Sequence, residues 1–111
     1  FVTGPATTIP SPAANLHVVK VTSALEMLHA AESAFEKVDV AIFAAAVADF
    51  RVSKPADEKI KRKDSSLQIE LVQNPDIAAT LGSRKTNQFT VGFALETENE
   101  VDQAQKKLLK K

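Results

Sequence analysis

The stretch that decides the fold is VDVAIFAAA, residues 38–46, a nearly continuous apolar run. Such a run is typical of a central strand in a parallel sheet, where both faces are covered and polar side chains have no place. Three alanines end the run, and Asp49 follows them. The stretch therefore predicts a buried strand whose end opens into a loop that carries a carboxylate.

Short apolar runs alternate with segments of helical period on both sides of this stretch. Strands that alternate with helices predict an α/β fold around a mainly parallel sheet. We expect one domain over residues 1–111, without repeats or linkers. The further strands are expected at residues 16–21 (LHVVKV), 67–72 (LQIELV, half-exposed) and 88–94 (QFTVGFA).

The first expected helix follows the strand at residues 16–21. Thr22 or Ser23 can cap it, and Glu26 stands three residues after Ser23, which is the spacing of a capping box. One face is expected to be buried because apolar residues recur at helical spacing, namely Leu25, Leu28, Ala31 and Phe35.

Two more helices are expected in the second half of the chain. Asn74 is the expected cap of the first, Pro75 lies in its first turn, and the helix ends near Gly82. The last helix opens near residues 97–99. Its apolar side consists of Val101, Ala104, Leu108 and Leu109.

Composition and charge exclude several classes of function. Lys+Arg and Asp+Glu balance at 14 each, so no global field favours nucleic acid or an anionic membrane as a partner. There is no cysteine, which excludes disulfides, thiolate metal sites and a cysteine nucleophile and fits a reducing cytoplasm. No apolar run approaches the roughly 20 residues that span a bilayer. Both ends of the chain are interpreted as cuts in a larger domain.

Candidate chemistry lies at the carboxyl ends of the expected strands, where open parallel sheets bind ligands. Residues 44–49, 74–77 and 92–97 arrive at this edge. Ala44, Ala45 and Ala46 would let a flat ligand approach the backbone, and Asp49 suits a ribose hydroxyl, a base amine or a metal-bound phosphate. Close helix packing with Asp49 capping a turn explains the same residues equally well.

A long basic loop is expected over residues 50–66, and long loops are often lids or binding loops. It carries Arg51, Lys54, Lys59, Lys61, Arg62 and Lys63, which could close on phosphates. A solvated surface loop is the alternative. Phe93 either stacks on a base or fills the core, and His17 and His29 lack partners at metal-binding spacing, so both are interpreted as structural.

In their order along nearly the whole chain, these segments resemble phosphopantothenate–cysteine ligase. The matching stretches are TGP (3–5), VTSALEM (21–27), AAAVADFR (44–51), KIKRK (59–63), NPDI (74–77), VGFALET (91–97) and the lysine-ended helix. The resemblance implies a Rossmann-like three-layer α/β fold, here truncated at both ends, and a cytoplasmic bacterial enzyme that works as a homodimer.

The resemblance also implies the reaction. CTP, with Mg²⁺ on its triphosphate, would activate 4'-phosphopantothenate as an acyl-cytidylate, and L-cysteine would then displace CMP in coenzyme A biosynthesis. The family is usually the C-terminal half of a bifunctional flavoprotein. FMN is therefore expected only in the decarboxylase domain, which is absent here.

Site residues follow from the same resemblance. Lys59, in a lid over residues 50–66, is the expected catalytic lysine, and the protein is expected to supply no metal ligands. The nucleotide-binding residues implied are Phe43, Ala44, Ala45, Asp49, Lys59, Asn74, Pro75, Asp76, Ile77, Phe93, Lys107 and Lys111.

The chain departs from the family pattern at its ends. The family's first strand, its glycine- and serine-rich loop and an asparagine used on the intermediate are missing, so the isolated chain is expected to be inactive. The residue pattern alone does not predict whether the nucleotide is CTP or ATP. Two other interpretations are a fragment of a Rossmann-like oxidoreductase and a non-catalytic nucleotide-binding or interaction domain.

Overall fold

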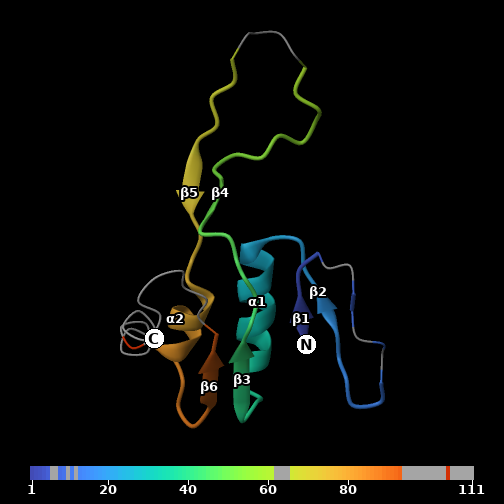
Figure 1. Ribbon diagram of the computed structural model, residues 1–111, viewed down its shortest axis with the longest axis vertical. Coiled ribbons are helices and arrows are strands. Elements are labelled where there is room, and N and C mark those ends of the chain that lie inside the picture. Colours follow the sequence, from blue (N-terminus) through green and yellow to red (C-terminus); the bar gives the residue numbers. More distant parts are fainter. Residues whose placement is uncertain (6–7, 10, 12, 62–65, 94–104, 106–111) are drawn as a thin grey trace.

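The computed structural model describes residues 1–5, 8–9, 11, 13–61, 66–93 and 105. A body of helices and strands carries a projecting arm, and a small pair of strands lies beside it (Figure 1). In chain order the elements are β1 (Val2–Thr3), β2 (Val19–Lys20), α1 (Ala24–Phe35), β3 (Val40–Phe43), β4 (Phe50–Val52), β5 (Leu71–Gln73), α2 (Ile77–Gly82) and β6 (Phe89–Gly92).

The strands form three pairs in the described part of the chain. β1 pairs with β2 and β3 with β6, both in parallel, whereas β4 and β5 are antiparallel. The expected α/β fold with mainly parallel pairing is thus confirmed. The strands expected at residues 16–21 and 67–72 are shorter than predicted, and β4 forms where only a loop was expected.

Helix α1 begins where the capping signal predicts. Ser23 is its cap, and the Ser23 Oγ accepts a hydrogen bond from the Glu26 backbone N–H at 3.2 Å. The Glu26 carboxylate in turn accepts from the Thr22 backbone N–H at 2.8 Å and from the Thr22 hydroxyl. These hydrogen bonds, that from the Thr22 backbone first among them, lower the pKa of Glu26 below its ordinary value.

Helix α2 begins two residues later than the sequence predicted. Its cap is Asp76, whose Oδ1 accepts from the Ala79 backbone N–H at 3.0 Å, and not Asn74. Pro75 consequently precedes the helix instead of lying in its first turn. Both Asn74 and Asp76 can cap, and hydrogen bonds elsewhere engage Asn74. The helix ends at Gly82, as expected.

A small core joins the two helices to β3. Phe35 of α1 and Ile77 and Leu81 of α2 are buried, and Ala41 and Phe43 of β3 pack against them. The expected burial of the α1 face is complete at Phe35 and partial at Leu25, Leu28 and Ala31.

The other face of β3 is open, so the expectation that both faces are covered is wrong for this chain. Val40 is 51% exposed and Ile42 64%, and Phe89, which pairs with Val40 on the neighbouring strand, is 69% exposed. A continuous apolar run indicates burial on both faces only when the chain itself supplies a second layer.

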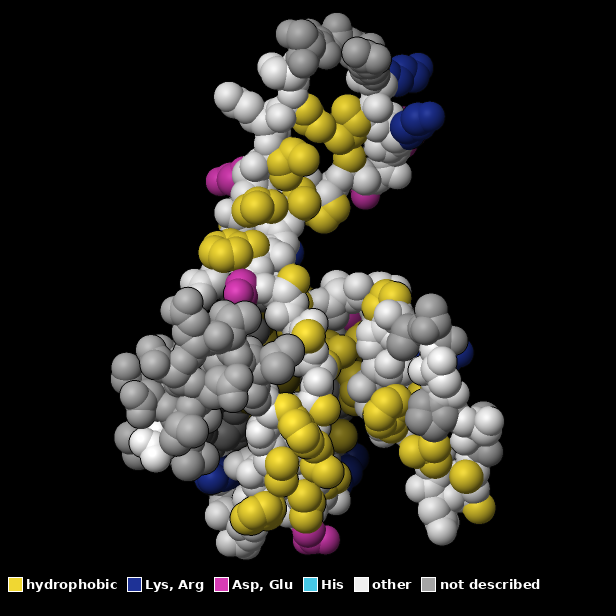
Figure 2. Space-filling model, viewed as in Figure 1, with side chains coloured by type: hydrophobic (Ala, Val, Ile, Leu, Met, Phe, Trp, Pro, Cys, Tyr) yellow, Lys and Arg dark blue, Asp and Glu magenta, His cyan; other side chains and the backbone are white. Residues whose placement is uncertain are grey.

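The arm consists of β4, β5 and the described residues between them, 53–61 and 66–70. It extends away from the body, with hydrophobic side chains along it (Figures 1 and 2). The radius of gyration of the Cα atoms is 17.2 Å, whereas a compact domain of about 100 residues has about 13 Å. Among the residues that the structure describes, no helix is long and apolar enough to cross a membrane.

Candidate functional site

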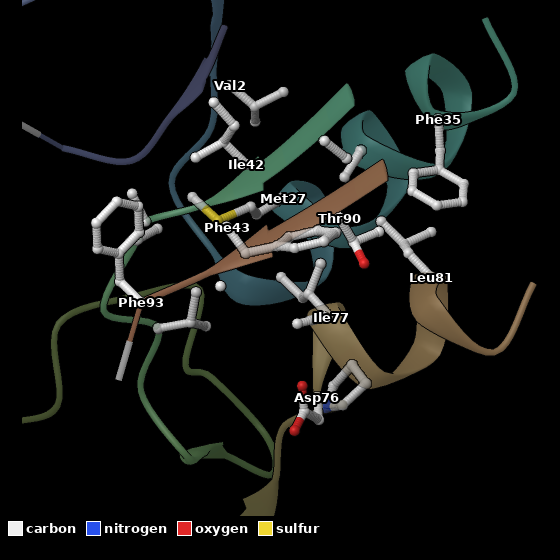
Figure 3. A pocket seen from close by; sticks show the side chains of 18 of the residues that line it. Val2, Met27, Phe35, Ile42, Phe43, Asp76, Ile77, Leu81, Thr90 and Phe93 are labelled. Carbon is white, nitrogen blue, oxygen red and sulfur yellow. The ribbon is translucent and has the colours of Figure 1, made fainter. Parts of the chain in front are cut away.

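One large pocket opens at the carboxyl ends of β1, β3 and β6, beside the start of α2. Its volume is about 1280 Å³, and Figure 3 shows side chains from both helices and several strands around it. The position is the one that open parallel sheets favour for ligands, because loops diverge there and leave backbone groups accessible.

Nine of the twelve residues expected to bind a nucleotide line this pocket, and they come from three separate segments. Sequence-distant motifs meet because β3 and β6 are parallel neighbours and α2 packs against β3. The nine are Phe43, Ala44, Ala45, Asp49, Asn74, Pro75, Asp76, Ile77 and Phe93.

The alanines after β3 are exposed, and two of them, Ala44 and Ala45, line the pocket. Ala44, Ala45 and Ala46 are all exposed, and so is Asp49. Among the described residues, this exposure favours the interpretation in which a ligand approaches the strand end. Short side chains on an exposed strand end leave the backbone open to a ligand.

Asn74 connects two sides of the pocket. Its Nδ2 donates to the Ala48 carbonyl at 2.8 Å, and its backbone N–H donates to the Asp49 carbonyl at 2.7 Å. Its Oδ1 accepts from Nη1 of Arg51 at 3.2 Å, and the residue is only 9% exposed. The Asn74 carboxamide is therefore engaged within the protein. The Asp49 and Asp76 carboxylates are exposed at the pocket, and Oδ1 of Asp76 accepts the capping hydrogen bond of α2.

The two phenylalanines of the pocket lie in different surroundings. Phe43 is half-buried and packs against the core, where Figure 3 shows it between Met27 and Ile77. Phe93 lies at the opposite side of that view from Phe35 and is 73% exposed. The alternative that Phe93 fills the core is therefore wrong, and its ring is free to contact a ligand.

The expected catalytic lysine is not brought to this pocket. Lys59 is exposed in the arm and is absent from the pocket lining. Lys61 is exposed in the same segment. Lys107 and Lys111, together with Arg62, Lys63 and the expected last helix over residues 97–111 apart from Gln105, lie outside the described residues.

Three lining residues were not singled out as strongly from the sequence. Thr3 and Gly4 follow β1 into the pocket, and Met27 lies in the first turns of α1. A Cβ on Gly4 would lie 3.9 Å from the Met27 Cε, an ordinary contact. Thr3 and Gly4 belong to the TGP stretch that matches the family, but β1 has only two residues, which is too short for a strand pattern to be recognised.

The described residues include no cluster of three metal-ligating side chains. His29 lies on α1 with its Nδ1 3.5 Å from Glu32, on the molecular surface.

Comparison with known proteins gives a consistent set of similarities. Residues 1–111 match the family described as the DNA/pantothenate metabolism flavoprotein C-terminal domain. The chain is 44% identical over 98 residues to the coenzyme A biosynthesis bifunctional protein CoaBC of Haemophilus influenzae, covering 87% of this chain and 24% of that protein. It is 48% identical over 112 residues to a protein of an unknown prokaryotic organism named cysteine/cysteine sulfinic acid decarboxylase, covering 100% of this chain and 31% of that protein.

The structure also resembles a solved one. The crystal structure of the C-terminal domain of CoaBC superposes with a TM-score of 0.80 at 38% sequence identity, over 98% of this chain and 49% of that chain. The present chain thus spans less than a third of the two curated relatives and about half of the solved domain.

Proposed function

Since this chain belongs to the family of DNA/pantothenate metabolism flavoprotein C-terminal domains, we propose that it supplies most of the nucleotide site of a phosphopantothenate–cysteine ligase in coenzyme A biosynthesis. The observation that carries the proposal is the meeting of residues 43–49, 74–77 and Phe93 around one pocket. The pocket is open to solvent, and its volume of about 1280 Å³ is larger than the roughly 300–1,000 Å³ of ordinary small-molecule sites.

The proposed reaction has two steps. The carboxylate of 4'-phosphopantothenate attacks the α-phosphorus of CTP, forming an acyl-cytidylate and releasing pyrophosphate. The amine of L-cysteine then attacks the acyl carbon, loses a proton, and releases CMP as the amide bond forms. Positioning of the reacting groups and stabilisation of phosphate charge are the main contributions that a protein makes to such chemistry.

The lining residues suit a nucleotide in distinct ways. The exposed backbone at Ala44 and Ala45 can approach a flat base, and the Asp49 carboxylate can accept hydrogen bonds from a ribose hydroxyl or a base amine. Phe93, with 73% of its surface exposed, offers a ring for stacking. CTP is proposed over ATP because the motifs resemble those of the CTP-dependent bacterial family.

Mg²⁺ would enter with the nucleotide. Mg²⁺ in nucleotide sites is typically held by substrate phosphates with one or two carboxylates. Although the sequence predicted no metal ligand from the protein, Asp49 is an exposed carboxylate at this pocket that could contact the ion. The ion supplies charge neutralisation on the triphosphate. FMN has no proposed role in this chain.

Lys59 is proposed to stabilise phosphate charge as pyrophosphate leaves. Because it lies in the arm and away from the pocket lining, this role requires the arm of the same or another subunit to bring its Nζ to the phosphates.

We also propose that the active form is a homodimer. The arm exposes Phe50, Leu67, Ile69 and Leu71, each between 57% and 62% exposed. An isolated two-stranded ribbon is marginally stable in water, and pairing with a second copy would cover its apolar residues and free strand edges.

We place the enzyme in the cytoplasm, where CTP and cysteine are available, and fractionation of the source cells tests this location.

The decarboxylase activity named for one relative is not proposed for this chain. The match covers 31% of that protein, and the matched pocket offers no feature that favours decarboxylation over nucleotide binding.

The full-length protein that carries this chain provides the test. With CTP, Mg²⁺ and 4'-phosphopantothenate, we expect about one pyrophosphate per active site without cysteine, and continuous release once cysteine is added. ATP in place of CTP should support slower release. A correctly folded protein that releases no pyrophosphate with either nucleotide would overturn the proposal.

A further inference from the structure

Arg51 is the outer member of a hydrogen-bonded chain that ends at the pocket. Its Nη1 donates to the Gln73 carbonyl at 2.7 Å and to Oδ1 of Asn74 at 3.2 Å. The Asn74 Nδ2 then donates to the Ala48 carbonyl at 2.8 Å. Arg51 itself does not line the pocket, whereas Gln73, Asn74 and Ala48 do.

The chain of bonds joins three parts of the molecule. Arg51 belongs to β4 at the base of the arm, and Asn74 stands between β5 and α2. Ala48 belongs to residues 44–49, which we call the strand-end wall of the pocket. A second bond, from the Asn74 backbone N–H to the Asp49 carbonyl at 2.7 Å, holds the same wall.

The Asn74 carboxamide has two orientations, and Arg51 distinguishes between them. A guanidinium only donates hydrogen bonds, so it requires the carboxamide oxygen on its own side. The nitrogen then faces the Ala48 carbonyl, which only accepts. With Arg51 removed, only the Ala48 carbonyl still selects this orientation, and Asn74, which is only 9% exposed, loses a charged partner.

We propose that Arg51 is a positioning residue for the nucleotide site, which holds the strand-end wall against the start of α2 by orienting Asn74. This inference rests on the proposed function. It concerns substrate binding, because the wall carries Ala44, Ala45 and Asp49, the groups assigned to the nucleotide.

The test uses Arg51→Gln in the full-length protein, with pyrophosphate release measured over a range of CTP concentrations. Loss of a hydrogen bond from a charged group corresponds to about a tenfold effect or more. We expect the KM for CTP to rise about tenfold while kcat changes less than about twofold, which is the pattern of lost uniform binding. Arg51→Lys should recover much of the affinity, since an ammonium group can also donate to both oxygens.

A role limited to the stability of the arm predicts a different result. Arg51→Gln would then lower Tm but leave the KM of the folded enzyme unchanged, and that outcome overturns the proposal. Arg84→Gln is the matched control, because Arg84 bonds the Glu32 carboxylate on the surface and does not line the pocket. It should leave the KM unchanged.

If Arg51→Gln does not fold, Asn74→Asp is the second variant, and it distinguishes an effect on the strand-end wall from an effect on the stability of the arm. The aspartate keeps an acceptor for Arg51 but has no donor for the Ala48 carbonyl, so the KM should rise without a large fall in Tm. In the double variant the two effects should not add, because both act through one bond. An unchanged KM in Asn74→Asp, or full additivity, contradicts the proposal.

Hydrogen exchange makes the test independent of the reaction. Arg51→Gln should speed exchange of the Asn74 backbone amide, which bonds the Asp49 carbonyl. If wild-type protein releases no pyrophosphate, the ligase proposal fails, while altered exchange still supports the positioning of the wall. Unaltered exchange would count against Arg51 as a positioning residue even in an active ligase.

Discussion

Nη1 of Arg84 donates to Oε1 of Glu32 at 2.7 Å and so joins the turn after α2 to the last turn of α1. The Arg84 side chain is 61% exposed and that of Glu32 28%. Beneath this surface pair, Leu81 and Phe35 meet in the core at 2% and 5% exposure. The two helices are thus joined by an exposed ion pair and by a buried apolar contact, and these two interactions are expected to contribute unequally to the free energy of unfolding.

Burial should dominate the energy of this helix pair. Leu81→Ala is expected to lower the free energy of unfolding by about 2–5 kcal/mol because it leaves a cavity. Arg84→Ala should lower it by about 1 kcal/mol or less, since solvent screens an exposed ion pair. Urea unfolding of both variants measures the difference, and equal losses would contradict this assignment.

The capping box of α1 should make helix stability depend on pH. Glu26 has a lowered pKa in the folded state, so its contribution is present above the unfolded-state pKa and is lost as the pH falls through the lower, folded-state pKa. Glu26→Gln should be less stable than wild type at neutral pH, and the two should converge in acid. Thermal unfolding from pH 7 to about pH 3 covers the range in which carboxylates titrate.

Ser23→Ala serves as the comparison for this pH series. It removes the hydroxyl that accepts from the Glu26 backbone N–H and should cost about 1 kcal/mol. The Ser23 hydroxyl does not titrate in this range, so its own contribution should persist at low pH. A Glu26→Gln variant whose deficit stays constant down to acid pH would show that the carboxylate charge contributes nothing.

Lys59→Ala should slow the release of pyrophosphate at saturating CTP. If Lys59 stabilises the leaving phosphates, a loss of about 10²-fold in kcat or more is the size expected for removing one charged transition-state contact. Lys61→Ala is the matched control, two residues away and equally exposed. Equal effects of the two substitutions would indicate a general electrostatic contribution of the arm in place of a specific lysine.

Ile69→Glu should convert the proposed homodimer into monomers, because it places a charge among the apolar residues of the arm. Ile69 is 58% exposed. Phe89→Glu provides the comparison, since Phe89 is 69% exposed on the open face of β6. Sedimentation should report a monomer for the first variant and a dimer for the second. The reverse result would place the interface on the β3–β6 face.

Phe93→Ala should weaken nucleotide binding without a comparable loss of stability. Its ring is 73% exposed, so truncation removes little buried surface, whereas a lost base–aromatic stack is worth about 1–3 kcal/mol. Calorimetric titration with CTP is the measurement, and Phe89→Ala is the control, because Phe89 is 69% exposed on β6 and does not line the pocket. Unchanged affinity in Phe93→Ala would remove the stacking role.

The sequence by itself determined the features that depend on neighbouring residues. Ser23 and Glu26 marked the start of α1 because a capping box is made within one turn. The apolar runs at β3 and β6 indicated parallel strands, and the strand-end position of residues 44–49 and 74–77 indicated where a ligand would bind. These inferences agree with the structure because each depends on a local pattern or on the general geometry of parallel sheets.

Only the tertiary structure decided which groups become partners across the fold. Asp76 and not Asn74 caps α2, because the Asn74 carboxamide forms hydrogen bonds with Ala48 and Arg51, both more than 20 residues away. Phe93 is exposed, β3 is open on one face, and β4 and β5 form an arm that carries Lys59 away from the pocket. Each outcome depends on the position of distant segments, and a side chain's chemistry states what it can bond but not what the fold brings within reach.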